Sequence, residues 1–163
     1  MKERFVADCM LGRLAKWLRI LGYDTLYERS RGKGVSRPPE SLGDRRLLTR
    51  RRDLVKDVPG CVYIRSDHVG DQLCQMVREG LIHPDPEEGF RRCPSCNTEL
   101  VGADPEDARD RIPEYVFFRH ARDLLWCPLC KRYYWHGTHR NRMRAQLEVW
   151  GVLSVQKPTI ERE

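Results

Sequence analysis

Apolar positions in the first half of the chain follow two different periods, and each period indicates a different element. Residues 4–8 are a short apolar run that ends in a carboxylate, Asp8, as in a buried strand. Leucines then recur at helical spacing through residues 11–21, and Gly22 follows where that helix would end. Residues 23–27, 46–49 and 61–65 are further strand candidates, with β-branched and aromatic residues dominating the last.

A second helix is expected from about residue 67 to residue 79, with Ser66 or Asp67 as its cap. Strands that alternate with helices imply a parallel sheet with right-handed crossovers. Residues 29–44 show no periodicity and are expected to be mostly loop, and residues 83–90 are expected to be a linker. The pattern therefore predicts an α/β domain over residues 1–84, followed by a second unit.

The second unit carries two C-x-x-C pairs, CPSC at 93–96 and CPLC at 127–130. Each pair can place two thiolates at the tip of a tight turn, and two such turns complete a tetrahedral zinc site. We therefore predict a zinc ribbon over residues 90–145, with one structural Zn²⁺ held by Cys93, Cys96, Cys127 and Cys130. A redox dithiol and an iron–sulfur cluster are the alternatives, and two matched pairs favour zinc over both.

The stretch between the two pairs, 30 residues long, exceeds the usual range and predicts an insertion, for which Asp104–Asp110 is the candidate. Since four cysteines satisfy the metal, His136 and His139 are expected to be surface or RNA-contacting groups. A closed site leaves no position for substrate, so this zinc should stabilise and not catalyse. Residues 146–163 are assigned to a C-terminal tail whose last residues should fray.

The other cysteines, Cys9, Cys61 and Cys74, have apolar neighbours, and we expect buried, reduced thiols at all three. No apolar run approaches the roughly 18 residues of a membrane span, so no membrane association is expected. The first residues, MKERFVADC, lack the pattern of a signal peptide. Together with the reduced thiols, these features predict a cytoplasmic protein.

Basic residues are concentrated in two blocks of a chain with net charge +6. Residues 28–56 form the first block and residues 131–144 the second, with an acidic segment between them. Such blocks suggest a polyanionic partner, although a solvated surface is the simpler explanation. Cations interleaved with aromatic rings suit RNA. The predicted RNA-binding residues are Arg50, Arg51, Arg52, Lys131, Arg132 and Arg140; Tyr133 and Trp135 should point into the ribbon core and Tyr134 outward.

Several segments together carry a family resemblance: VADCMLGRLAKWLRILGYDT, LLTRRRDL, VYIRSD and CPSC…CPLCKRYYWHGTH. They resemble the PIN-like RNase family named after the C-terminal domain of the mut-seven exonuclease, over most of residues 4–145. The resemblance implies a small three-layer PIN-like domain with a parallel sheet, joined to a zinc ribbon. It also implies a metal-dependent ribonuclease, in which carboxylates gather Mg²⁺ or Mn²⁺ to activate water and stabilise the scissile phosphate.

Carried over by position, the resemblance implies Asp8 and Asp67 as site carboxylates, with Asp53 as a further candidate, and gives Asp24 a structural role. The family pattern L-L-T-R-D ends here in Arg51, and a guanidinium opposes a divalent cation. The leading hypothesis is an endoribonuclease of RNA processing or decay. The alternative is a non-catalytic RNA- or ribosome-binding module with a degenerate site, and a third is an adaptor that uses residues 104–114. The sequence predicts no oligomeric state.

Overall fold

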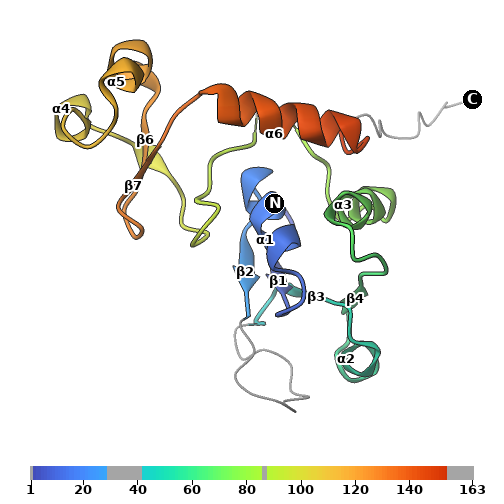
Figure 1. Ribbon diagram of the computed structural model, residues 1–163. Coiled ribbons are helices and arrows are strands. Elements are labelled where there is room, and N and C mark those ends of the chain that lie inside the picture. Colours follow the sequence, from blue (N-terminus) through green and yellow to red (C-terminus); the bar gives the residue numbers. More distant parts are fainter. Residues whose placement is uncertain (1, 29–41, 86–87, 154–163) are drawn as a thin grey trace, which may run out of the picture.

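Four short parallel strands form the sheet of the N-terminal half (Figure 1). The computed structural model describes residues 2–28, 42–85 and 88–153. The strands stand in the order β2-β1-β3-β4, so β1 and β3 are central. Their bounds are Phe5–Ala7 (β1), Thr25–Tyr27 (β2), Arg46–Thr49 (β3) and Val62–Tyr63 (β4). The expected parallel α/β sheet is confirmed.

Helices cover both faces of this sheet, as a three-layer domain requires. They are α1 (Gly12–Ile20), α2 (Arg52–Asp57) and α3 (Val69–Arg78). Neighbouring strand residues point to opposite faces, so Phe5 and Ala7 pack with the helices α1 and α3. Val6 lies on the other face in a smaller cluster with Leu54 of α2. The pattern did not predict α2, because a six-residue helix shows too little periodicity.

The start of α3 differs from the expectation. Its N-cap residue is His68, and no side chain caps the helix there. Ser66 accepts a hydrogen bond from the His68 N–H at 3.1 Å and donates its own hydroxyl to Asp71 at 3.0 Å. Asp67 does not cap the helix and is solvent-exposed. The helix therefore begins at Val69, two residues later than the sequence suggested, and the side chain of Ser66 orders the loop that precedes it.

The second half is built on a three-stranded antiparallel sheet in the order β5-β6-β7. The strands are Val101–Gly102 (β5), Leu125–Cys127 (β6) and Arg132–Tyr134 (β7). Between β5 and β6 lie α4 (Pro105–Ala108), α5 (Glu114–His120) and the 3₁₀ helix Ala121–Asp123. Of these helices, only α4 falls within Asp104–Asp110, the candidate insertion, and Figure 1 shows α4 and α5 at the end of the molecule away from α3.

Helix α6 (Thr138–Val149) joins the two halves. It begins just after β7 and runs across the top of Figure 1 towards α3. Leu147 and Val152 are buried in the core cluster of the N-terminal domain. The Trp150 ring meets the Trp17 ring edge-on, with centroids 5.0 Å apart. This first part of the expected tail is therefore packed, and its last ten residues, 154–163, lie outside the described ranges.

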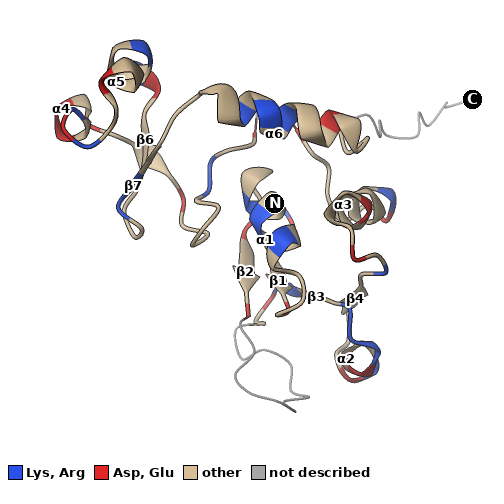
Figure 2. Cartoon of the chain, viewed as in Figure 1, with Lys and Arg blue, Asp and Glu red and all other residues tan. Residues whose placement is uncertain are grey.

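Charges are distributed unevenly over these elements. Figure 2 places Lys and Arg on α1, β7 and α6, and it shows Asp and Glu on α4 and α5. No helix within the described ranges combines the length and the apolar character that crossing a bilayer requires.

Candidate functional site

The four cysteines of the two C-x-x-C pairs converge on one point. All four sulfur atoms lie within 4.8 Å of one another, and in the described ranges no other group of three or more potential metal ligands does so. The Cys93–Cys130 and Cys96–Cys127 sulfur pairs are 3.9 Å and 3.4 Å apart. Thiolates at the corners of a tetrahedral zinc site, with Zn–S of about 2.3 Å, lie about 3.8 Å apart. The cluster is therefore compatible with a zinc ribbon.

The two knuckles that hold these cysteines have the same backbone geometry. The residue after each second cysteine, Asn97 or Lys131, is left-handed, with φ of 74° and 57°. Its N–H donates to the carbonyl of the first cysteine of its own pair, at 2.9 Å in both knuckles. This turn brings both sulfur atoms to one side, and it explains why each pair needs its two-residue spacer.

Polar groups around the cluster can stabilise thiolates. The Tyr134 hydroxyl lies 3.1 Å from the Cys93 sulfur, and the Thr98 hydroxyl lies 3.3 Å from the Cys96 sulfur. The expectation that Tyr134 points outward is therefore wrong. Tyr133 and Trp135 do pack into the ribbon core formed with α4 and α5, as expected. Alternation along β7 sends Tyr134 to the opposite face, which the cysteines occupy.

The other three cysteines are less buried than expected. Cys9 is exposed, because it lies in the turn between β1 and α1, and Cys61 and Cys74 are half-buried. Burial, followed by the charge of Asp8, raises the pKa of the Cys61 thiol to about 11. Cys61 is thus an inert thiol at neutral pH, while Cys9 is open to solvent.

The first knuckle is fastened to the N-terminal domain. Arg19, a nearly buried residue of α1, donates to the Pro94 carbonyl at 3.1 Å and the Ser95 carbonyl at 2.9 Å. The Asn97 side chain accepts from the Thr25 N–H at 2.9 Å and donates to Asp24 at 2.6 Å. Through these contacts the first knuckle packs directly against the α/β domain.

Asp24 is a structural carboxylate, in agreement with the role implied for it. Arg45 donates to its two oxygens at 2.7 Å and 2.8 Å. Burial alone would raise the pKa of Asp24, but the hydrogen bonds from Arg45 and Asn97 hold it far below its ordinary value. The group is consequently charged at neutral pH and fully engaged.

Asp8 stands at the carboxyl end of β1, the central position of the sheet edge. It is 6% exposed, and one of its oxygens accepts from the Met10 N–H at 2.9 Å. The other accepts from the hydroxyl of Thr49, the last residue of the neighbouring strand β3. Open α/β sheets place their sites at this edge. Asp8 is held rigidly there, in a turn that leads into α1.

The other two predicted carboxylates do not join Asp8. Asp53 is exposed on α2 and pairs with Arg51, whose Nη2 lies 2.5 Å from its Oδ2. This hydrogen bond is the main cause of a lowered pKa at Asp53 and a raised pKa at Arg51. The charge of Asp8 also raises the pKa of Arg51, so the guanidinium interacts electrostatically with both carboxylates. Asp67 is 71% exposed, 3.7 Å from His68.

The sequence reasoning missed Glu28, an acidic residue whose backbone lies next to that of Asp8. Glu28 follows β2, and the parallel register pairs Ala7 with Tyr27, so Glu28 stands next to Asp8. Its N–H donates to the Ala7 carbonyl at 2.9 Å. A carboxylate directly after each of two strand candidates was the available signal. The signal becomes meaningful only when the strands are known to be adjacent and in this register.

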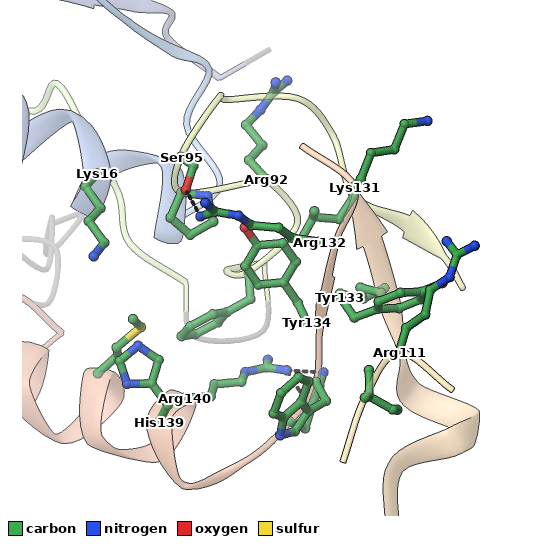
Figure 3. A pocket seen from close by; sticks show the side chains of 18 of the residues that line it. Lys16, Arg92, Ser95, Arg111, Lys131, Arg132, Tyr133, Tyr134, His139 and Arg140 are labelled. Atoms are coloured by element: carbon green, nitrogen blue, oxygen red, sulfur yellow. Dashed lines mark hydrogen bonds between the residues drawn. The ribbon is translucent and has the colours of Figure 1, made fainter. Parts of the chain in front are cut away.

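The six predicted RNA-binding residues fall into two separate groups. Arg50, Arg51 and Arg52 lie at the carboxyl edge of β3 and the start of α2, where Arg52 stacks over the Tyr63 ring at 5.8 Å. Lys131, Arg132 and Arg140 line a cavity of about 520 Å³ between the ribbon, α1 and α6 (Figure 3). Arg50, Arg51 and Arg52 do not line this cavity.

Comparison with known proteins gives one family. The family model described as "Mut7-C RNAse domain" matches residues 3–147, which is most of the chain. No match was found among curated proteins or among solved structures.

Proposed function

The chain belongs to the Mut7-C RNAse domain family, and from that premise we propose that it acts on RNA chiefly by binding it. The observation that carries the proposal is the position of Arg51. Its guanidinium forms an ion pair with Asp53 and interacts electrostatically with Asp8. It lies at the sheet edge where a PIN-type site would need a surplus of negative charge. A cation at this point attracts an RNA phosphate and repels a divalent ion.

The carboxylates support the same proposal. A divalent ion of this type needs several oxygen ligands that reach it together. Asp8, Asp53 and Asp67 form no group within ligand distance among the described residues. Asp8 is already engaged by the Met10 N–H and the Thr49 hydroxyl, which is a sufficient structural role for a buried carboxylate. In this proposal, Arg50, Arg51 and Arg52 at the sheet edge contact RNA phosphates.

The second candidate function is metal-dependent endoribonuclease activity in RNA processing or decay. The placement of Asp8 favours it, because a rigid carboxylate stands at the central strand of the sheet with Glu28 beside it in register. In this proposal Asp8, Asp67 and Asp53 would hold Mg²⁺ or Mn²⁺, which would activate a water and stabilise charge on the scissile phosphate. Asp67 and Asp53 would have to approach Asp8 when RNA binds.

The proposal also covers the metal of the four-cysteine cluster, the cell compartment and the RNA partner. We propose zinc as the metal of the four-cysteine cluster, since its ligand set and sulfur spacing fit zinc. Such a cluster needs reduced cysteines, which suits a cytoplasmic protein. Structured RNA, including that of the ribosome, presents the phosphates that the two basic groups would contact.

A binding assay and a cleavage assay on the same preparations separate the two functions. We expect wild-type protein to bind single-stranded RNA and to leave it intact with Mn²⁺ present. Arg51→Asp, which restores the acidic residue of the family pattern, should weaken RNA binding and increase Mn²⁺ binding. Lys56→Asp, an equal charge change on the exposed side of α2, is the matched control. Mn²⁺-dependent cleavage by the wild type that disappears in Asp8→Asn would refute pure binding and establish the nuclease.

A further inference from the structure

The cavity between the ribbon, α1 and α6 combines a positive lining with aromatic rings. Among the described residues that line it, six are Lys or Arg and none is Asp or Glu. They are brought together from separate elements: Lys16 comes from α1, Arg92 directly precedes the first knuckle, and Arg111 lies between α4 and α5. Lys131 and Arg132 come from the second knuckle and β7, and Arg140 comes from α6. Only tertiary packing assembles this set of cations.

Apolar and aromatic side chains form most of the rest of the lining, which also includes Ser95, His136 and His139. Phe90, Tyr134, Trp135 and Met143 are among the side chains that contribute to it. The guanidinium of Arg140 stacks over the Phe90 ring at 4.5 Å from its centroid. Figure 3 shows Tyr134 near the middle of the view, with Arg132 beside it and with Lys16 and His139 to the left. A ligand here would meet cations and ring faces together.

We propose that this cavity binds one unpaired nucleotide of an RNA strand, with the base against the aromatic side chains and the adjoining phosphates on the cations. The inference rests on the proposed RNA-binding function and adds the kind of contact that the ribbon makes. A volume of about 520 Å³ lies within the roughly 300–1,000 Å³ of small-ligand pockets. Aromatic faces and arginine planes are the surfaces on which proteins stack unpaired bases.

Charge complementarity favours a nucleotide over an apolar or a purely ionic ligand. A cavity lined by cations alone would suit any polyanion, and an apolar cavity would suit a hydrophobic side chain. The presence of both implies a ligand with an anionic part and a flat apolar part. A base inside a duplex cannot reach the rings, so the site should prefer single strands.

Protein contacts fix the walls of the cavity. Arg132 donates to the Ser95 hydroxyl at 3.2 Å, and the Tyr134 hydroxyl lies against the Cys93 sulfur. Both residues are thereby tied to the first knuckle, which Arg19 holds against α1. The cavity is thus preorganised, which reduces the entropy lost when a ligand binds.

The test uses full-length, zinc-loaded protein and three probes: a short oligouridylate, a duplex RNA of the same length, and an inorganic polyphosphate of matched charge. We expect oligouridylate to bind at least about tenfold more tightly than the other two, equivalent to about 1.4 kcal/mol. Lys16→Glu should remove most of this preference. Arg119→Glu, the same charge reversal on an exposed residue of α5 outside the cavity, should not change it.

Tryptophan fluorescence supplies a second readout that does not depend on affinity. Oligouridylate should quench wild-type emission, and Trp135→Phe should lose that quenching while Trp17, Trp126 and Trp150 keep emitting. Uridine monophosphate should quench in the same way at higher concentration, because the proposed cavity takes a single nucleotide. Equal binding of polyphosphate and oligouridylate, or displacement of oligouridylate by an acidic peptide, would overturn the base pocket. RNA binding through Arg51 would survive that outcome.

Discussion

The side-chain amide N–H of Asn97 donates a hydrogen bond to Asp24 at 2.6 Å, and this contact joins the first cysteine knuckle to the sheet domain. Asn97 directly follows Cys96 of the four-cysteine cluster, in a left-handed conformation. Asp24 directly precedes β2 and also accepts a hydrogen bond from Arg45. The metal cluster and the α/β core therefore share one hydrogen-bond network, and disturbance of one should be measurable in the other.

Replacement of Asn97 by glycine should destabilise the protein by about 1–3 kcal/mol, because the buried Thr25 N–H loses its acceptor. Glycine keeps the left-handed backbone without strain, so the change isolates the side chain. Lys131→Gly, at the equivalent position of the second knuckle, is the control and should be neutral or slightly stabilising. Urea unfolding of both variants measures the difference, and equal losses would contradict the proposed contact.

The depressed pKa of Asp24 predicts a specific acid dependence. A carboxylate whose pKa is lower in the folded state contributes stability above its unfolded pKa of about 4. That contribution is lost as the pH falls below about 4 towards the folded pKa. Asp24→Asn should therefore cost stability at neutral pH, and the difference from the wild type should shrink in acid. A pH series of urea midpoints tests this, and a constant difference would exclude Asp24 as the source.

Removal of the zinc proposed for the four-cysteine cluster should unfold residues 90–140 and expose the four thiols. Alkylation followed by mass spectrometry should label Cys9 readily with or without a chelator, because that thiol is exposed. Cys93, Cys96, Cys127 and Cys130 should be labelled only after chelation. Protection of all four thiols in fully metal-free protein, or an intact ribbon there, would refute the metal-dependent fold.

Trp150 should anchor α6 to the N-terminal domain. Its ring packs edge-on against Trp17 and lies so close to Gly70 that a Cβ added there would come within 2.7 Å of it. Because Trp150 is half-buried, Trp150→Ala should cost less than the roughly 3–5 kcal/mol of a fully buried ring, about 2 kcal/mol. Val149→Ala, at an 80% exposed neighbour, should change little. Thermal unfolding measures both, and equal effects would argue against the anchor.

RNA binding should weaken steeply as salt rises, since phosphate contacts release counterions. The logarithm of the affinity should fall linearly with the logarithm of the salt concentration. Removal of one phosphate contact, as in Arg52→Ala, should make that slope shallower by about one unit. Arg122→Ala, at an exposed arginine beside α5, is the control. A flat salt response of the wild type would count against phosphate-dominated binding.

The sequence by itself determined the features that depend on short-range spacing. Two C-x-x-C pairs were sufficient to identify the four cysteines that converge, because each knuckle is a local turn. Leucine periodicity located α1, and the β-branched run located β4, since each pattern reports local backbone geometry. The quoted motifs also identified the family that matches residues 3–147.

Tertiary structure decided which separated residues meet. The register of β1 and β2 placed Glu28 beside Asp8, and the packing of β3 on β1 gave Asp8 a hydroxyl partner in Thr49. Tyr134 lies on the face of β7 that packs towards the cysteines, so its hydroxyl contacts Cys93. Leu147 is buried in the core of the first domain, so α6 packs against that domain. Such pairings depend on which apolar faces exclude water together. That is a property of the whole chain, and no local pattern records it.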